Sequence, residues 1–180
     1  LFMGTIFRFS GLVELLTELA PALHLDKSIK FLILGDGEDF NRLHQLAITL
    51  GLQSQVIMPG RIEYDLLADY LRLGHVALLP FKQELVTHGA LPGKVLQYLA
   101  CGLPTIATPL DGLQSMISPN KGILYANDSQ EMVNMAIDLV SKPDQQHQLA
   151  TFGLDLMTRH CNWHTQLQSF EQMIASFQRA

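Results

Sequence analysis

Pro92-Gly-Lys-Val-Leu-Gln-Tyr-Leu-Ala-Cys-Gly-Leu-Pro-Thr-Ile-Ala107 is the stretch that decides the fold. Proline suits the first turn of a helix, Gly102 suits the left-handed position just past the helix end, and Pro104 prevents the helix from continuing. We therefore expect a helix over residues 92–101 and, directly after the turn, a buried strand over residues 105–107.

The same alternation of helical periodicity and short apolar runs extends in both directions, which indicates repeated βα units and a parallel sheet. The expected strands are 1–3, 31–34, 56–58, 76–80, 105–107 and 123–125, and the expected helices are 11–23, 38–50, 64–72, 92–101, 129–141, 143–160 and 163–178. Several strands are continuously apolar, as strands covered on both faces require. The fold class is therefore α/β, a Rossmann-like doubly wound parallel sheet of about six strands with a helical C-terminal tail. Residues 1–142 are expected to form the α/β unit, and residues 143–180 to form helices that complete it.

Composition narrows the functional classes. The chain has 180 residues, which predicts one domain, and 12 Lys and Arg against 17 Asp and Glu give a net charge of −5. An apolar fraction of 48% excludes a disordered chain, and the acidic balance argues against a nucleic-acid binder. Two cysteines are too few for a disulfide framework, so a cytoplasmic location is expected, and no membrane span is expected. The chain starts with Leu inside an apparent strand, so we expect it to be part of a longer protein.

Metal ligation is not expected. His160, Cys161 and His164 have a suggestive spacing, but the sequence offers no further Cys or His nearby and Asn162 is expected to break the helix between them.

Ligands of open parallel sheets bind at the carboxyl ends of the strands, so the loops that follow strands are the candidate site. Residues 4–11 are bracketed by glycines and contain Arg8, whose guanidinium suits phosphate oxygens. Gly35-Asp36-Gly37-Glu38 follows a strand, and Pro59-Gly60-Arg61-Ile62 closes another. For each of these loops an ordinary tight turn remains an equal alternative.

The loop over residues 81–91 is the most informative, because connections in α/β units usually take about 2–6 residues. Lys94 follows it in the first turn of the expected helix, where the helix dipole is positive and a lysine is misplaced unless an anion lies beside it. Gln97 lies on the same helix face, three residues on. Free amides, the dipole and the ammonium together predict a diphosphate site; a lysine turned into solvent is the alternative.

Five segments, in order and at the expected spacing, resemble the C-terminal half of retaining glycosyltransferases of family four, which have the two-Rossmann-domain (GT-B) architecture. The segments are Gly4 with Gly11-Leu-Val-Glu-Leu-Leu16, Phe31-Leu-Ile-Leu-Gly-Asp-Gly-Glu38, Val56-Ile-Met-Pro-Gly-Arg61, His75-Val-Ala-Leu-Leu-Pro80 and the stretch from Pro92 to Thr108. The resemblance covers about residues 1–140. The tail resembles the family too, since Trp163 opens a last helix that in such enzymes crosses toward the N-terminal domain.

The resemblance implies a donor-binding half that takes a nucleotide-diphosphate sugar as substrate, requires no cofactor or metal, and is inactive alone. Its implied partners are an N-terminal domain of the same chain and an acceptor saccharide or lipid-linked saccharide in polysaccharide or glycoconjugate synthesis. Peripheral contact with the inner face of a membrane is left open. The implied donor-binding residues are Gly4, Thr5 and Arg8 near the diphosphate, Gly35, Asp36 and Gly37 along the pocket, Gly60, Arg61 and Ile62 beside the base, Gly93 and Lys94 on phosphate, and Gln97 toward the ribose.

The chain departs from the family pattern at charged positions. Thr5 and Ser10 stand where the family has an arginine and a lysine, and Gly89 and Gln97 stand where it has two glutamates. The family usually has a third glutamate, and Ser115 stands at that position here. The resemblance then leaves Lys94 and Arg8 to stabilise phosphate charge, and Glu84 or His88 as candidates to replace the lost sugar contact.

Two alternatives stay open. One is a non-catalytic module that binds a nucleotide sugar or serves assembly, and the other is a sugar-nucleotide epimerase of the same architecture. Donor binding without transfer or hydrolysis would indicate the first, and conversion of a donor without any acceptor would indicate the second.

Overall fold

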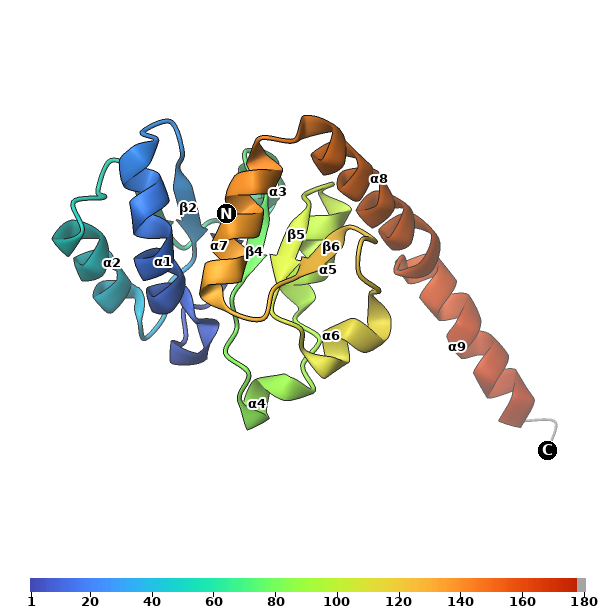
Figure 1. The fold of residues 1–180 in the computed structure, drawn as a ribbon. Helices are drawn as coiled ribbons and strands as arrows, with labels where there is room; N and C mark the ends of the chain where they lie inside the picture. The colour runs from blue at the N-terminus through green and yellow to red at the C-terminus, as the bar shows by residue number, and fades with distance from the viewer. Residues whose placement is uncertain (178–180) are drawn as a thin grey trace.

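Six parallel strands form the centre of the fold, in two sheets of three (Figure 1). The computed structural model describes residues 1–177. The first sheet has the order β1 (Phe2–Met3), β2 (Phe31–Leu34), β3 (Val56–Gly60), and the second has the order β4 (Ala77–Leu79), β5 (Thr105–Ala107), β6 (Ile123–Tyr125). In register, Phe2 lies opposite Ile33, and Ile106 lies opposite Leu124.

Backbone hydrogen bonds on both sides of Leu1 join the two sheets edge to edge. The main-chain nitrogen of Leu1 donates to the Val76 carbonyl at 2.7 Å, and the Leu1 carbonyl accepts from the Leu78 N–H at 2.8 Å. This is the pattern of a parallel pair with Leu1 opposite Ala77. The strands therefore follow one another as β3-β2-β1-β4-β5-β6, which is the Rossmann order. The strand order reverses direction between β1 and β4, and this position is the topological switch point of the sheet. The prediction of a Rossmann-like parallel α/β fold of about six strands is confirmed.

Helices cover both faces of the sheets. They are α1 (Leu12–Leu25), α2 (Phe40–Thr49), α3 (Leu67–Arg72), α4 (Leu85–His88), α5 (Gly93–Ala100), α6 (Asp111–Met116), α7 (Ser129–Val140), α8 (Pro143–His160) and α9 (Trp163–Phe177), with 3-10 turns at Arg8–Ser10 and Tyr64–Leu66. α1 and α7 pack side by side (Figure 1). The alternation of side chains along β1 explains the two layers: Phe2 joins the core that includes Leu16 of α1, whereas Met3 joins a second core with Leu71 of α3 and Tyr98 of α5.

Three helical segments differ from the sequence expectation. The helix expected over residues 64–72 consists of a 3-10 turn followed by the short α3, because Leu67 begins the regular α-helical turns. α4 and α6 were not expected; they have four and six residues, too few for periodicity to reveal. The expected end of the last helix at residue 178 lies outside the described residues.

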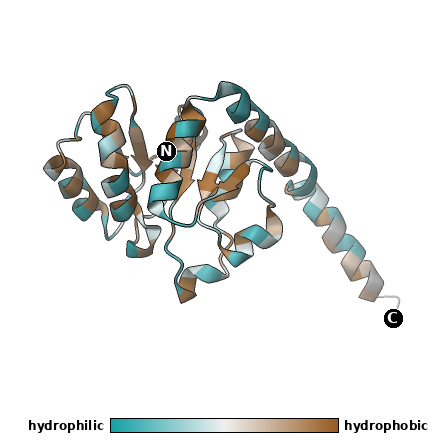
Figure 2. Cartoon of the chain, viewed as in Figure 1, coloured by the Kyte–Doolittle hydropathy of each residue, from teal (hydrophilic) through white to brown (hydrophobic). Residues whose placement is uncertain are grey.

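The two C-terminal helices differ in their contacts with the rest of the chain. α8 packs against α5 and α7, whereas α9 projects away from the body (Figure 1). Hydropathy follows this arrangement, since the strands are mostly brown and the outer helix faces mostly teal in Figure 2. Among residues 1–177, no helix combines the length and apolar character needed to cross a membrane.

Candidate functional site

The residues singled out by sequence meet at the switch point between β1 and β4. Gly4 directly follows β1, and Lys94 is the second residue of α5. A Cβ atom on Gly4, whose φ is +127°, would lie 2.5 Å from Nζ of Lys94. Glycine at position 4 therefore allows the ammonium to rest on the backbone at the end of β1.

Two aromatic rings hold the ammonium of Lys94. Its Nζ lies 4.3 Å from the centre of the Phe2 ring and 4.9 Å from the centre of the Phe81 ring, within the range of cation–π contacts. None of the ion pairs formed among residues 1–177 includes Lys94. Burial lowers the pKa of Lys94 from 10.5 to about 8. The site thus contains a mostly desolvated positive charge without a counter-ion, which an anionic ligand would supply.

α5 is anchored to β1 one turn beyond Lys94. The hydroxyl of Tyr98 accepts from the Met3 N–H at 2.8 Å and donates to the Met3 carbonyl at 3.2 Å. Burial raises the pKa of Tyr98, so the hydroxyl stays protonated. Because residues four apart share a helix face, this tether holds the face of α5 that carries Lys94 against the end of β1.

Glycines of two further loops line the end of the first sheet. The Gly35 N–H donates to the Gly60 carbonyl at 2.8 Å, and a Cβ on Gly35 would lie 2.1 Å from the Gly4 carbonyl oxygen. A Cβ on Gly37 would lie 2.5 Å from the Ile6 carbonyl oxygen. Backbone therefore packs directly on backbone here, and any side chain at these positions would push the loops apart.

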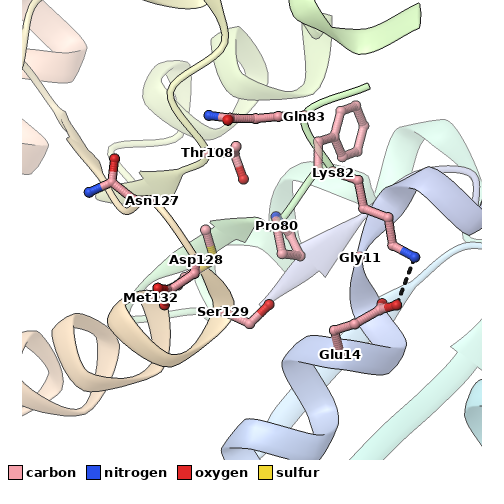
Figure 3. A pocket seen from close by; sticks show the side chains of 11 residues that line it. Gly11, Glu14, Pro80, Lys82, Gln83, Thr108, Asn127, Asp128, Ser129 and Met132 are labelled. Carbon is pink, nitrogen blue, oxygen red and sulfur yellow. Dashed lines mark ion pairs between the residues drawn. The ribbon is translucent and has the colours of Figure 1, made fainter. Parts of the chain in front are cut away.

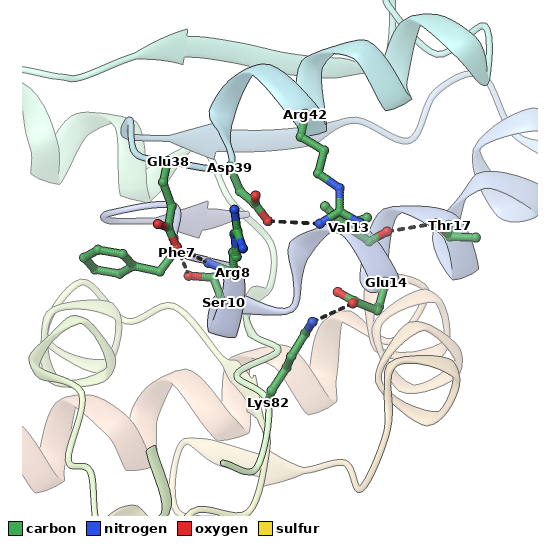
Figure 4. Close-up of polar contacts among 10 residues, drawn as sticks. All are labelled: Phe7, Arg8, Ser10, Val13, Glu14, Thr17, Glu38, Asp39, Arg42 and Lys82. Atoms are coloured by element: carbon green, nitrogen blue, oxygen red, sulfur yellow. Dashed lines mark hydrogen bonds and ion pairs between the residues drawn. The ribbon is translucent and has the colours of Figure 1, made fainter. Parts of the chain in front are cut away.

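The loop over residues 4–11 is held by its own polar groups (Figure 4). The buried hydroxyl of Ser10 accepts from the Phe7 N–H at 3.1 Å and donates to the Thr5 carbonyl at 3.3 Å. The main-chain N–H of Arg8 donates to Glu38 at 3.0 Å, which ties this loop to the one after β2. Ser10 therefore has a structural role in which a lysine could not replace it, while the side chains of Thr5 and Arg8 are exposed.

The remaining predicted residues lie on three segments, which are the loop after β3, the middle of α5 and the region of α4. Arg61 is exposed and Ile62 is half-buried directly after β3, and Gln97 is half-buried on α5. Glu84 directly precedes the short helix α4 and His88 ends it. The Thr87 hydroxyl bonds the Glu84 main chain, and His88 lies 3.4 Å from Asp111 at the start of α6. The structure thus brings Gly4, Gly35, Gly37, Gly60 and Lys94 together, and it places Glu84 and His88 on a separate segment tied to α6.

Three contributors were missed by sequence reasoning. Phe2 and Phe81 hold the ammonium, and Tyr98 fixes α5 to β1. The sequence feature that could have revealed Tyr98 is its spacing of four residues from Lys94, which places both on one helix face. No local pattern marks Phe2 or Phe81 as partners of a lysine, because the contact joins three distant segments.

Two cavities lie at opposite ends of the strands. A cavity of about 200 Å³ lies at the carboxyl ends of β4, β5 and β6, beside Phe81 and the first turns of α1 and α7 (Figure 3). A larger one, of about 530 Å³ and mostly apolar, opens at the amino ends of the strands, near Phe31 and Val76. Ligands of open parallel sheets bind at the carboxyl ends, so the smaller cavity belongs to the functional edge. Among the described residues, no group of three or more His, Cys, Asp or Glu is placed to share one metal ion.

Residues 1–142 match the family described as Glycosyl transferases group 1. Among curated relatives, one subunit of the phosphatidylinositol N-acetylglucosaminyltransferase of Arabidopsis thaliana is 26% identical over 140 residues, which cover 74% of this chain and 30% of that protein. N-acetyl-alpha-D-glucosaminyl L-malate synthase of Bacillus anthracis is 29% identical over 120 residues, which cover 66% of this chain and 29% of that protein. The chain therefore spans less than a third of the length of these two relatives.

Solved structures share the fold. The C-terminal domain of LpcC, a glycosyl transferase group 1 family protein from Francisella tularensis, has a TM-score of 0.75 at 20% identity, covering 90% of this chain and 85% of that one. Anabaena HepE in complex with UDP has a TM-score of 0.78 at 17% identity, covering 97% of this chain and 48% of that one. With residues 1–142 matched to the family and the fold of a C-terminal glycosyl transferase domain, the chain belongs to the glycosyl transferases of group 1.

Proposed function

We propose that the chain is the donor-binding half of a retaining glycosyltransferase of family four, which moves a sugar from a nucleoside-diphosphate sugar to an acceptor saccharide or lipid-linked saccharide. The observation that carries the proposal is the ammonium of Lys94, which is largely removed from solvent at the switch point of a Rossmann sheet and forms no ion pair with another residue of 1–177. The match of residues 1–142 to group 1 glycosyl transferases supports the reaction class.

The chemistry follows from where charge develops. Breaking the bond between the sugar and the diphosphate leaves negative charge on the departing phosphate. The N-terminus of α5 and the ammonium of Lys94 are fixed before the reaction, so they would stabilise this charge without reorganisation. In a retaining reaction of this kind the leaving diphosphate assists the acceptor on the same face of the sugar, and no protein nucleophile is required.

The other predicted residues take positions around the diphosphate. Gly60, Arg61 and Ile62 would contact the base, and Gln97 would face the ribose hydroxyls. Arg8 would reach the diphosphate from its exposed place in the loop over residues 4–11. This proposal includes Glu84 and His88 as contacts to the donor sugar. The Anabaena relative was solved with UDP, which makes UDP the first nucleotide to test.

Turnover is proposed to need an N-terminal domain that supplies most of the acceptor site. α9 supports this arrangement, because it projects from the body and exposes Trp163, Leu167 and Phe170 at helical spacing, a face suited to packing against another domain (Figure 1). We place the enzyme in the cytoplasm, in polysaccharide or glycoconjugate synthesis.

Calorimetric titration of this chain with UDP, GDP and ADP tests the proposal. One nucleotide should bind, and Lys94→Ala should weaken its binding at least several-fold. The matched control is Lys82→Ala, which removes an ammonium that is already paired with Glu14 and should change nucleotide affinity little. Absence of binding by all three nucleotides to the folded chain would contradict the proposal.

Sugar transfer is the second readout. With UDP-sugars and simple acceptors the isolated chain should show no turnover, and robust transfer by the chain alone would refute the assignment of the acceptor site to another domain. Joined to its N-terminal domain, the chain should transfer sugar. Donor binding without transfer or hydrolysis would instead indicate a binding module.

A further inference from the structure

The smaller cavity is separated from the ammonium of Lys94 by the ring of Phe81, which lines the cavity and also contacts that ammonium. The cavity, of about 200 Å³, lies between the first turns of α1 and α7 (Figure 3). Ligand cavities for drug-sized molecules measure about 300–1,000 Å³, so this one suits a single ring. None of the donor contacts proposed above lies in its lining.

The charges in the cavity disfavour a second anion. Lys82, the cation of the lining, is already paired with Glu14 at 2.7 Å (Figure 3). Although burial raises it, the hydrogen bond from Lys82 and its charge hold the pKa of Glu14 below its usual value. Asp128 adds a second carboxylate, so a phosphate would meet more negative than positive charge here. A neutral ligand is favoured.

The lining combines an apolar surface with hydrogen-bonding groups at its edge. Pro80 and Met132 supply the apolar part, and Asp128 and Ser129 stand at the edge (Figure 3). Asp128 uses Oδ1 to accept from the Glu131 N–H at 2.8 Å, and its second oxygen makes no hydrogen bond with the described residues. The Ser129 hydroxyl likewise has no hydrogen bond within residues 1–177.

A pyranose ring matches this pattern, because it presents C–H groups on its faces and hydroxyl groups around its rim. Carboxylate oxygens accept from sugar hydroxyls, and a serine hydroxyl both donates and accepts. Asp128 is solvent-exposed in the free chain, so a ligand that covers it must supply a hydrogen-bond donor in place of water, and an apolar ring without hydroxyls has none.

We propose that this cavity binds one neutral pyranose ring of the acceptor saccharide, with Asp128, Ser129 and Glu14 bonding its hydroxyls. The proposal rests on the proposed function, since it places acceptor sugar one aromatic ring away from the diphosphate. It also assigns part of the acceptor site to the donor-binding half. Gln83 and Asn127, whose amides border the cavity, would adjust which sugar fits.

Amide NMR spectra of this chain test the proposed sugar cavity and the proposed nucleotide site separately. Titration with methyl glycosides of glucose, galactose and N-acetylglucosamine should shift the amides of Gly11, Gln83 and Ser129 for at least one sugar. UDP alone should shift Gly4 and Lys94, which reports the nucleotide site.

Variants then identify the groups that bind the ring. Ser129→Ala and Glu14→Gln should each weaken glycoside binding at least threefold without changing the response to UDP. The matched control, Ser54→Ala, changes an exposed serine in the turn before β3 and should leave glycoside binding unchanged.

Three outcomes would overturn the proposal in different ways. UDP shifts without glycoside shifts up to the solubility limit would refute the cavity assignment and leave the nucleotide site intact. Shifts at the cavity with a UDP-sugar but with no free glycoside would show that the donor's own sugar occupies it, which refutes the acceptor assignment. Glycoside shifts that Ser129→Ala and Glu14→Gln leave unchanged would place the sugar elsewhere. Absence of UDP shifts counts against the proposed function alone.

Discussion

Replacing Lys94 by methionine should stabilise the unliganded chain while weakening nucleotide binding. The methionine keeps the apolar stem and removes a charge that burial has desolvated. The pKa of Lys94 is lowered from 10.5 to about 8, and each unit corresponds to about 1.4 kcal/mol, so the buried charge costs about 3 kcal/mol at pH 7. The cation–π contacts with Phe2 and Phe81 return part of this, about 0.5–2 kcal/mol.

The expected net gain from Lys94→Met is therefore about 1–2.5 kcal/mol at pH 7, or roughly 2–10 °C in Tm for a chain of this size. The gain should shrink with rising pH. Between pH 8 and 10.5 the folded chain binds fewer protons at Lys94 than the unfolded chain, so the wild-type stability rises with pH across this window. At pH 10 the charge cost falls below about 1 kcal/mol.

Urea denaturation at pH 7 and pH 10 measures both values. A Lys94→Met chain less stable than wild type at pH 7, with the same difference at pH 10, would refute the idea that an unpaired charge is held in the site. Nucleotide titration adds an independent check. Wild-type affinity should fall above pH 8 by up to about tenfold per pH unit as the ammonium deprotonates, and the variant should show no such slope.

Three further substitutions test the backbone contacts and hydrogen bonds that position the site. Gly35→Ala should cost at least about 2 kcal/mol in urea denaturation, because its Cβ would lie 2.1 Å from a carbonyl oxygen at φ +133°, whereas Gly89→Ala, with open space around it, should change stability little. Tyr98→Phe should cost about 1–3 kcal/mol in the same assay, since it leaves a buried main-chain N–H of β1 unpaired; Tyr64→Phe, at an exposed ring, is the control, and equal effects would contradict the tether. Ser10→Ala should cost about 1 kcal/mol and weaken nucleotide binding in calorimetry by releasing the loop over residues 4–11, and unchanged affinity would show that the loop does not contact the nucleotide.

The strands and the long helices could be predicted because their signals are local. Four-residue apolar runs such as Phe31–Leu34 and the Gly102–Pro104 stop signal are short-range features that the fold does not override. The short helix α4 could not be predicted, because a side-chain hydroxyl holds it. The buried Thr87 hydroxyl bonds the Lys82 and Glu84 carbonyls, and such a contact leaves no periodic pattern in the sequence.

The site was predictable only in part. Lys94 could be picked out because a lysine at a helix N-terminus opposes the dipole, and Gly4 because a close backbone approach requires glycine. The contact of Lys94 with Phe2 and Phe81 could not be predicted, because it depends on which strands become neighbours in the fold. Ser10 was interpreted only as a missing lysine, whereas its buried hydroxyl organises the loop.

The uncharged side chain of Gln97 leaves Lys94 without a carboxylate on its own helix face. A glutamate at position 97 would lie one turn from Lys94 on the same helix face, close enough to pair with its ammonium. Gln97 is uncharged and half-buried, and the contacts of the Lys94 ammonium include the rings of Phe2 and Phe81 but no ion pair with a residue of 1–177. An anion that binds here therefore regains the solvation that the ammonium lost on folding, and it does so without first displacing a carboxylate. An uncharged residue at position 97 therefore favours the anion binding that we propose for this site.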